Sequence, residues 1–247
     1  MVVLRKMILR LGIVILLSTG RYITICAQEQ SSRDTFDIAG PTIHYPYNSK
    51  TSRFLSSAGL SMVTPPKDML ETAVEAPLAN FHIIYGLPRH FSLEGDITTI
   101  IVSNQLRLGP RVSFSQRNFG LKAGWDLAYA AGFLKHFGFN NSTRAWIHYP
   151  NFSAGYKMQH IAFTLEAETI LVSSVTTKSG DSKLTRSKIF LNGYTAAFYI
   201  EQRLHRNRVF AFGFKDNYVK YYWPTWMVFS TFNRFYHIPE LCFSWIL

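Results

Sequence analysis

The stretch FGLKAGWDLAYAAG, Phe119 to Gly132, is the clearest guide to the fold because its side chains alternate in character. Every second residue is apolar: Phe119, Leu121, Ala123, Trp125, Leu127 and Tyr129. The residues between them are small or charged and include Lys122 and Asp126. The faces of a helix repeat every ~3.6 residues, whereas those of a strand repeat every two. The stretch is therefore predicted to be a strand with one apolar and one polar face.

The same alternation recurs through the rest of the chain. Further strands are predicted to begin near Leu78, Phe91, Gln105, Trp146, Ile161 and Ile189, and in VFAFGFKDNY and ELCFSWIL. One more is placed in RFLSSAGLSMV or in WMVFSTF. Many run for about ten residues or more, whereas strands of soluble proteins usually have ~5–6 and a tilted membrane strand needs ~9–11.

Two further features favour lipid over a protein core as the neighbour of the apolar faces. The polar faces carry charges of both signs in mid-strand, and aromatic residues gather near strand ends, as in a bilayer interface belt. These aromatic residues are Tyr85, Tyr129, Trp146, Tyr221, Tyr222, Trp223 and Trp226. Only helices and closed barrels pair every backbone polar group inside lipid. The expected fold is all-β: a closed antiparallel transmembrane β-barrel of about 10 strands, roughly 8–12. A secreted soluble β-sandwich is the alternative.

The N-terminus has the pattern of a secretory signal peptide over residues 1–27. Basic Arg5, Lys6 and Arg10 precede an apolar run from Leu11 to Leu17, and ICAQ supplies a cleavage site after Ala27. A retained anchor or an acylated Cys26 are the alternatives. Residues 1–27 hold four basic residues and no acid, so 22 Lys and Arg remain against 15 Asp and Glu, near +7. Such a charge favours an anionic neighbour.

The remaining chain is divided into two parts. Residues 28–77 are expected to form an N-terminal arm, with a short helix over 65–76 or a first strand, and residues 78–247 the barrel. After cleavage Cys242 is the one remaining cysteine, so no intramolecular disulfide can form. Backbone pairing and burial must then hold the exported domain together.

The C-terminal ELCFSWIL resembles the terminal targeting strand of bacterial outer-membrane β-barrel proteins. Leu247 replaces the usual final aromatic residue, with Trp245 and Phe243 two and four positions before it. The resemblance is one of class. It implies location in the bacterial outer membrane after signal-peptide cleavage, and recognition of the last strand by the barrel-assembly machinery. The expected partners are outer-membrane lipid and anionic lipopolysaccharide headgroups, with no nucleic acid.

No catalytic, phosphate-binding or zinc motif is present in the sequence, so we expect no catalytic residue, cofactor or metal. The inward charges are predicted to form a lumen network because buried charges must be neutralised. This network comprises Glu94, Asp96, Arg107, Arg111, Lys122, Asp126, Lys157, Glu166, Glu168, Glu201 and Arg203.

The expected function is non-enzymatic: a structural, adhesive or narrow-channel role, with a lumen largely filled by the charged network. The alternatives are a barrel enzyme acting on envelope lipid, for which His136 and His148 flank a loop containing Ser142, and a secreted sandwich that binds a ligand.

Overall fold

The computed structural model describes residues 42–47, 51–66, 75–100, 102–134, 141–158, 161–179, 182–203, 208–225 and 234–247. The predicted signal peptide, His136, WMVFSTF and most of the expected 65–76 helix lie outside these residues. Among the described residues, no helix has the length and apolar character needed to cross a membrane.

The described residues form eleven strands, each antiparallel to its neighbours. They are β1 Phe54–Val63, β2 Ala76–Gly86, β3 Phe91–Ile100, β4 Ser103–Gln116, β5 Phe119–Leu134, β6 Asn141–Lys157, β7 Ile161–Ser179, β8 Ser182–Arg186, β9 Phe190–Arg203, β10 Val209–Val219 and β11 Tyr236–Ile246.

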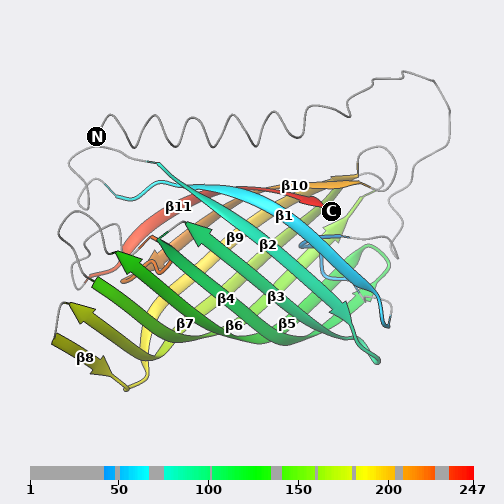
Figure 1. The fold of residues 1–247 in the computed structure, drawn as a ribbon. Helices are drawn as coiled ribbons and strands as arrows, with labels where there is room; N and C mark the ends of the chain where they lie inside the picture. The colour runs from blue at the N-terminus through cyan, green and yellow to red at the C-terminus, as the bar shows by residue number, and fades with distance from the viewer. Residues whose placement is uncertain are drawn as a thin grey trace. The chain divides into compact units, whose positions relative to one another are not determined.

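Ten of these strands close into a barrel (Figure 1). The order is β6-β5-β4-β3-β2-β1-β11-β10-β9-β7, and the additional pairing of β6 with β7 closes the ring. The first and last strands of the chain, β1 and β11, pair with each other, and β1 also pairs with β2 on its other side. β8 pairs with the last five residues of β7 and extends from the barrel rim. The expected closed antiparallel barrel of about 10 strands is confirmed.

The barrel begins at Phe54, so the division expected between residues 77 and 78 falls inside β2. The sequence of β1, FLSSAGLSMV, has small residues on both faces, which weakens the alternation that would mark it as a strand. Of the two places considered for a further strand, RFLSSAGLSMV forms β1. The polar stretch TTKSGDSKLTRSK, residues 176–188, contributes to the β7–β8 hairpin.

The outer face of the barrel is apolar and the inner face is polar at its centre. Trp125 is 54% exposed and Leu165 63%, whereas Asp126 is fully buried. Every strand of the ring presents large apolar side chains outward in this way. A contiguous apolar surface of this extent is incompatible with water, and it surrounds a sheet that has no open edge. The barrel therefore spans a membrane.

The two ends of the barrel differ in the length of their connections. Residues 87–90, 117–118, 158–160 and 204–208 connect strands at the end that holds the C-terminus. Residues 64–75, 101–102, 135–140 and 220–235 connect strands at the other end, together with the β7–β8 hairpin. In outer-membrane barrels the shorter turns are periplasmic and the longer loops are external. We call the second end the outer end.

Candidate functional site in the barrel lumen

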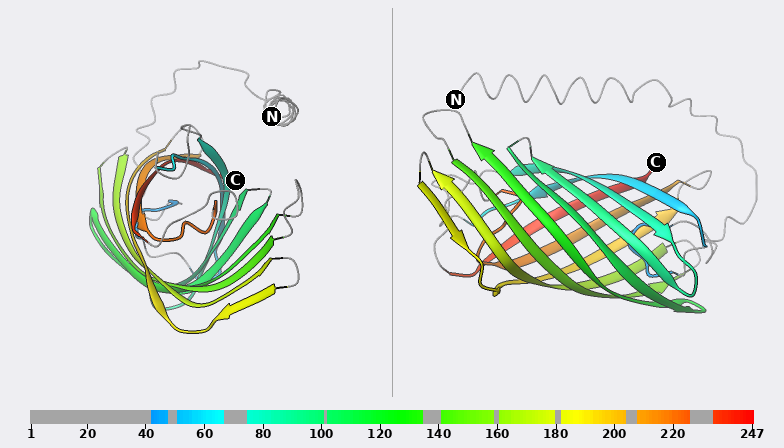
Figure 2. Two further views of the ribbon diagram at one scale, coloured as in Figure 1. Left: turned by 90° about the vertical axis from the view of Figure 1, so that its left-hand side faces the viewer. Right: turned by 60° about the horizontal axis from the view of Figure 1, so that its bottom comes forward.

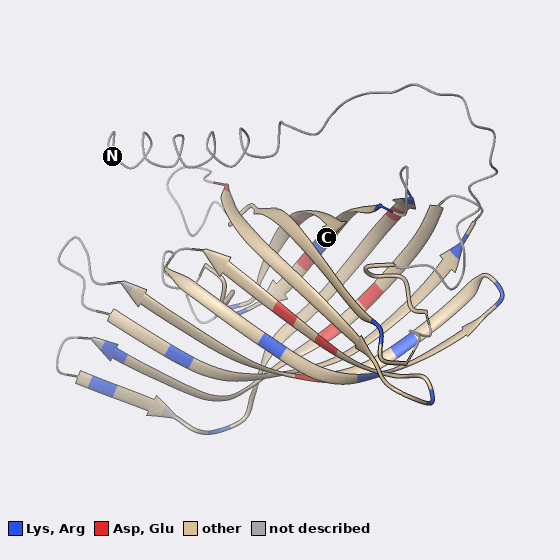
Figure 3. Cartoon of the chain, turned by 45° about the vertical axis from the view of Figure 1, so that its right-hand side comes forward, with Lys and Arg blue, Asp and Glu red and all other residues tan. Residues whose placement is uncertain are grey.

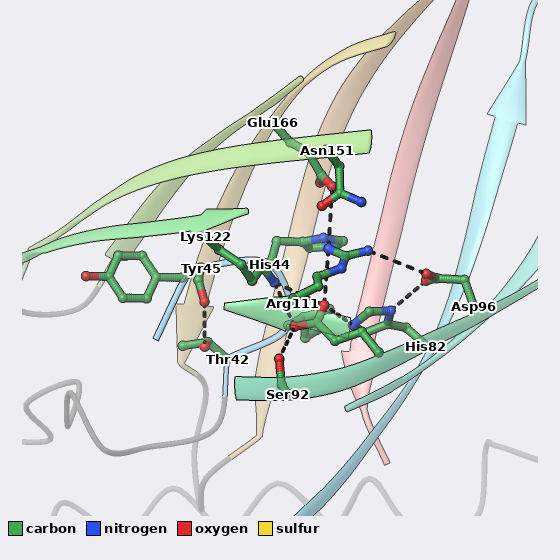
Figure 4. Close-up of polar contacts among 12 residues, drawn as sticks. Thr42, His44, Tyr45, His82, Ser92, Asp96, Arg111, Lys122, Asn151 and Glu166 are labelled. Atoms are coloured by element: carbon green, nitrogen blue, oxygen red, sulfur yellow. Dashed lines mark hydrogen bonds and ion pairs between the residues drawn. The ribbon is translucent and has the colours of Figure 1, made fainter. Parts of the chain in front are cut away.

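A charged cluster occupies the middle of the lumen (Figures 3 and 4). Arg111 on β4 lies at its centre, because its guanidinium is 2.8 Å from Asp126 on β5 and 3.1 Å from Glu94 on β3. It also lies 3.8 Å from the Glu166 carboxylate on β7. The inward positions of four strands thus converge on one side chain, which is itself buried.

Two more basic residues complete this cluster. Arg107, four residues before Arg111 along β4, contacts Asp126 at 2.6 Å and forms an ion pair with Glu168. Its guanidinium also stacks on the Tyr149 ring, 4.4 Å from the centroid. Lys122 donates to Glu94, with its Nζ 3.1 Å from Oε2. Each carboxylate of this cluster therefore faces a cation, which offsets the desolvation cost of the carboxylate.

Uncharged and histidine side chains also bind the carboxylates of this region. The Nδ2 atom of Asn151 donates to Asp126 at 3.0 Å, and the Ser92 hydroxyl donates to Glu94 at 3.1 Å. Asp96 pairs with His82, its Oδ1 lying 2.5 Å from Nδ1. Asp96 was predicted as a member of the charge network. Its partner His82, which stands directly opposite it in the register of β2 and β3, was not.

A second polar cluster lies across β10 and β11 and was not predicted. Lys215 and Glu240 are register partners, with Nζ 3.8 Å from Oε2. The Tyr222 hydroxyl donates to the same carboxylate at 2.8 Å, and Asn217 Nδ2 donates to it at 3.3 Å. The sequence could have predicted this cluster, because Lys215 and Glu240 both occupy polar positions of strands that alternate between polar and apolar residues.

Residues 42–47, which we call the inner segment, lie inside the barrel ring (Figure 2, left, blue). Glu201 on β9 holds this segment by accepting hydrogen bonds from three successive backbone N–H groups. The distances are 2.7 Å to Ile43, 2.6 Å to His44 and 3.0 Å to Tyr45. The His44 ring stacks on Tyr199, with centroids 3.7 Å apart. Glu201 was predicted as a member of the charge network. In the structure its carboxylate instead accepts hydrogen bonds from backbone N–H groups.

Paired glycines on two other strands make room for the inner segment. Gly120 on β5 and Gly155 on β6 are register partners. A Cβ atom at Gly120 would overlap the carbonyl oxygen of Pro46, and one at Gly155 would lie 2.6 Å from Tyr45 Cδ2. The Tyr45 hydroxyl donates to the Asn118 carbonyl at 3.2 Å, in the β4–β5 turn. These contacts place the inner segment at the end with the short turns.

The outer end of the lumen is filled by the chain that follows β10 (Figure 2, left, orange). Tyr222 and Trp223 are buried in an apolar cluster with Ile147, Val172 and Ile238. The Trp223 carbonyl accepts a hydrogen bond from the Ser103 hydroxyl at 3.1 Å. The interpretation of Tyr222 and Trp223 as interface aromatic residues is wrong, because an aromatic ring after a strand can fold inward as well as face lipid.

A cavity of ≈ 150 Å³ remains between these two fillings. Of the eleven predicted residues, seven form the central cluster: Glu94, Arg107, Arg111, Lys122, Asp126, Glu166 and Glu168. Asp96 adjoins it through His82 and, at 4.0 Å, Arg111. Lys157 and Arg203 lie apart, at the last residues of β6 and β9. Among the described residues, no group of three or more His, Cys, Asp or Glu side chains is arranged to hold a metal ion.

Neither a family model nor a curated protein matches the chain. Solved structures that resemble it include Neisserial surface protein A (10% identity, 78% of this chain and 96% of that one, TM-score 0.40). Others are the outer-membrane protease OmpT from Escherichia coli (11%, 78% and 93%, 0.43) and the attachment invasion locus protein Ail of Yersinia pestis (8%, 80% and 97%, 0.32).

The architecture of the chain is defined by its own strand pairing and by its apolar outer face. By that architecture the chain is a closed antiparallel transmembrane β-barrel of ten strands.

Proposed function

We propose that this protein is a sealed, non-catalytic outer-membrane barrel with a structural role in the envelope. The observation that carries the proposal is that the lumen is filled at three levels: the inner segment, the charged cluster, and Tyr222 with Trp223. A ring of about ten strands encloses little more space than the eight-strand case, which side chains just fill. The cavity that remains between these fillings has a volume of ≈ 150 Å³, which is enough for a few waters.

We further propose that the outer end contacts anionic lipopolysaccharide headgroups. Arg144 on β6 is exposed and stands on the same face as Trp146, two residues away. Lys178 and Lys183 are register partners on β7 and β8, and both are exposed. Like charges directly opposite one another are unfavourable unless an anion lies near. Salt-dependent binding of purified lipopolysaccharide, weakened by Lys178→Ala, would support this contact, and unchanged binding would argue against it.

Conductance in planar bilayers tests the sealed lumen. The intact protein should show no steady conductance. Glu201→Ala leaves three N–H groups of the inner segment without their acceptor, so this variant should show intermittent openings. Glu201→Gln, which keeps one acceptor oxygen, should open less often. Gln202→Ala, an outward-facing change at the next residue, is the matched control and should behave as wild type. Large, stable openings from the intact protein would replace the structural role with a channel role.

Export is proposed to follow cleavage after Ala27, with assembly of the barrel directed by β11. The mass of the mature protein from the envelope should correspond to a chain that begins at Gln28. An acylated Cys26, or a chain that still begins at Met1, would contradict the cleavage.

A further inference from the structure

An ion pair lies on the outward face of the barrel, in contrast to those of the lumen. Asp216 Oδ2 on β10 is 2.8 Å from His237 Nδ1 on β11, and these side chains are 36% and 69% exposed. Their neighbours two residues away on the same outward faces are Phe214 on β10 and Pro239 on β11. A charged pair is costly on a surface that meets lipid, and such residues usually mark a functional site.

A groove of ≈ 520 Å³ runs along the outer wall from this ion pair. The strand register explains it. Ala167, Ala196 and Asp216 form a row of short side chains across β7, β9 and β10. The rows on either side carry large residues, with Tyr194 and Tyr218 above and Phe198 and Phe214 below. The short row is therefore a channel between two rows of aromatic rings, and it continues to Pro150 and Phe152 on β6.

The groove descends from the membrane interface into the bilayer. On β10, Asp216 is two residues from Tyr218, near the outer end of the strand. On β6, Phe152 is six residues from Trp146, the tryptophan nearest the outer end of that strand. Because barrel strands tilt by ~35–45°, a row of register partners crosses the membrane obliquely. One end of the groove therefore lies at headgroup depth and the other among acyl chains.

Basic and aromatic groups surround the upper end of the groove, which we call the mouth. The Tyr218 ring lies 4.6 Å from His237 and 5.0 Å from Phe235. Lys220 Nζ in turn lies 5.0 Å from the Phe235 ring centroid. Two basic side chains, Lys220 and His237, thus stand above the aromatic wall of the groove, with His237 oriented by its contact with Asp216. An anionic headgroup would be complementary to them.

We propose that the groove binds one acyl chain of the phosphorylated glycolipid of the outer leaflet, with a phosphate of that lipid at His237 and Lys220. The mouth lies at headgroup depth and carries basic groups, which match the phosphate of such a lipid. The apolar channel below the mouth matches its acyl chain. The proposal does not depend on the lumen being sealed.

Native mass spectrometry of the full-length protein, released from detergent with added lipid A, tests this site. Wild type should retain one lipid A molecule. Ala196→Leu fills the row of short side chains and should lower the retained fraction about tenfold. Ala123→Leu makes the same change at an outward position of β5, away from the groove, and should retain lipid as wild type does. A heat-dependent shift in gel mobility verifies that each variant is folded.

A second variant tests the mouth. His237→Gln should weaken retention of lipid A but not of dephosphorylated lipid A, because only the phosphate loses a partner. Equal loss in Ala196→Leu and Ala123→Leu, or no loss in either, would overturn the groove. Equal retention of phosphatidylglycerol by wild type would overturn the assignment to the glycolipid.

Discussion

Arg111 illustrates how one residue can organise the interior of a barrel. Its guanidinium faces Glu94, Asp126 and Glu166 from three other strands. A guanidinium presents five N–H donors in a fixed planar arrangement, so it can serve several carboxylates where an ammonium would serve fewer. Replacing Arg111 would leave several buried carboxylates with reduced compensation, and the cost would arise from the acids that remain.

Arg111→Met should therefore lower the free energy of unfolding by about 3–5 kcal/mol, measured by urea unfolding in lipid vesicles. Arg144→Met is the matched control, because Arg144 is exposed at the outer end of β6, and it should change stability by less than about 0.5 kcal/mol. Similar effects of the two changes would show that the central cluster does not stabilise the fold.

His44 links the inner segment to pH. Burial lowers the pKa of His44 well below its usual value, and the nearby charges of His82 and Lys122 lower it further. The unfolded chain would bind a proton at His44 below about pH 6.5, while the native protein would not. The stability contributed by this group is thus present above that pH and is lost as the pH falls.

Lowering the pH from about 7.5 to about 5.5 should therefore reduce stability, with a contribution from His44 of up to ~1.4 kcal/mol per pH unit. His44→Phe preserves a ring against Tyr199 and should make the decline with pH shallower, as measured by unfolding at each pH. An identical slope in the variant and wild type would refute this role of His44.

At the scale of the element, β5 is a strand whose two faces meet different surroundings. Its outward residues are exposed apolar side chains, and its inward residues contact the charged cluster and the outer apolar cluster. Leu121→Arg should cost about 2–4 kcal/mol if its position lies near the bilayer midplane. Gln202→Arg, at the exposed end of β9, should cost roughly 0–1 kcal/mol. Equal costs at both sites, measured by unfolding in vesicles, would contradict the lipid-facing assignment of β5.

The same element shows how far the sequence could predict the structure. Period-two alternation identified most strands and their inward charges, because one face meets lipid and the other does not. It left β1 as one of two alternative places for a further strand, because the serines and glycine of β1 fit either face. It could not reveal the inner segment, because Glu201 binds backbone N–H groups that every residue type except proline carries. One hint of the inner segment was the presence of glycine at two inward positions, Gly120 and Gly155. These residues are register partners in β5 and β6.

At the scale of the whole molecule, the barrel is a wall with lipid outside and packed protein inside. The ring closes through the β1–β11 and β6–β7 pairings, so no strand edge of the ring is open to lipid. Two segments from distant parts of the chain then fill its ends. The inner segment precedes β1, and Tyr222 with Trp223 follows β10.

Methyl NOE spectroscopy of the protein in lipid nanodiscs, with labelled alanine and leucine, tests this arrangement most directly because it needs no substitution. Methyl groups of Leu121, Ala123 and Leu127 should show NOEs to lipid acyl chains. Those of Ala128 and Ala130, buried in the outer apolar cluster, should show NOEs to protein only, with none to lipid and none to bulk water. Lipid NOEs at both sets of residues, or water NOEs at Ala128 and Ala130, would contradict a sealed barrel.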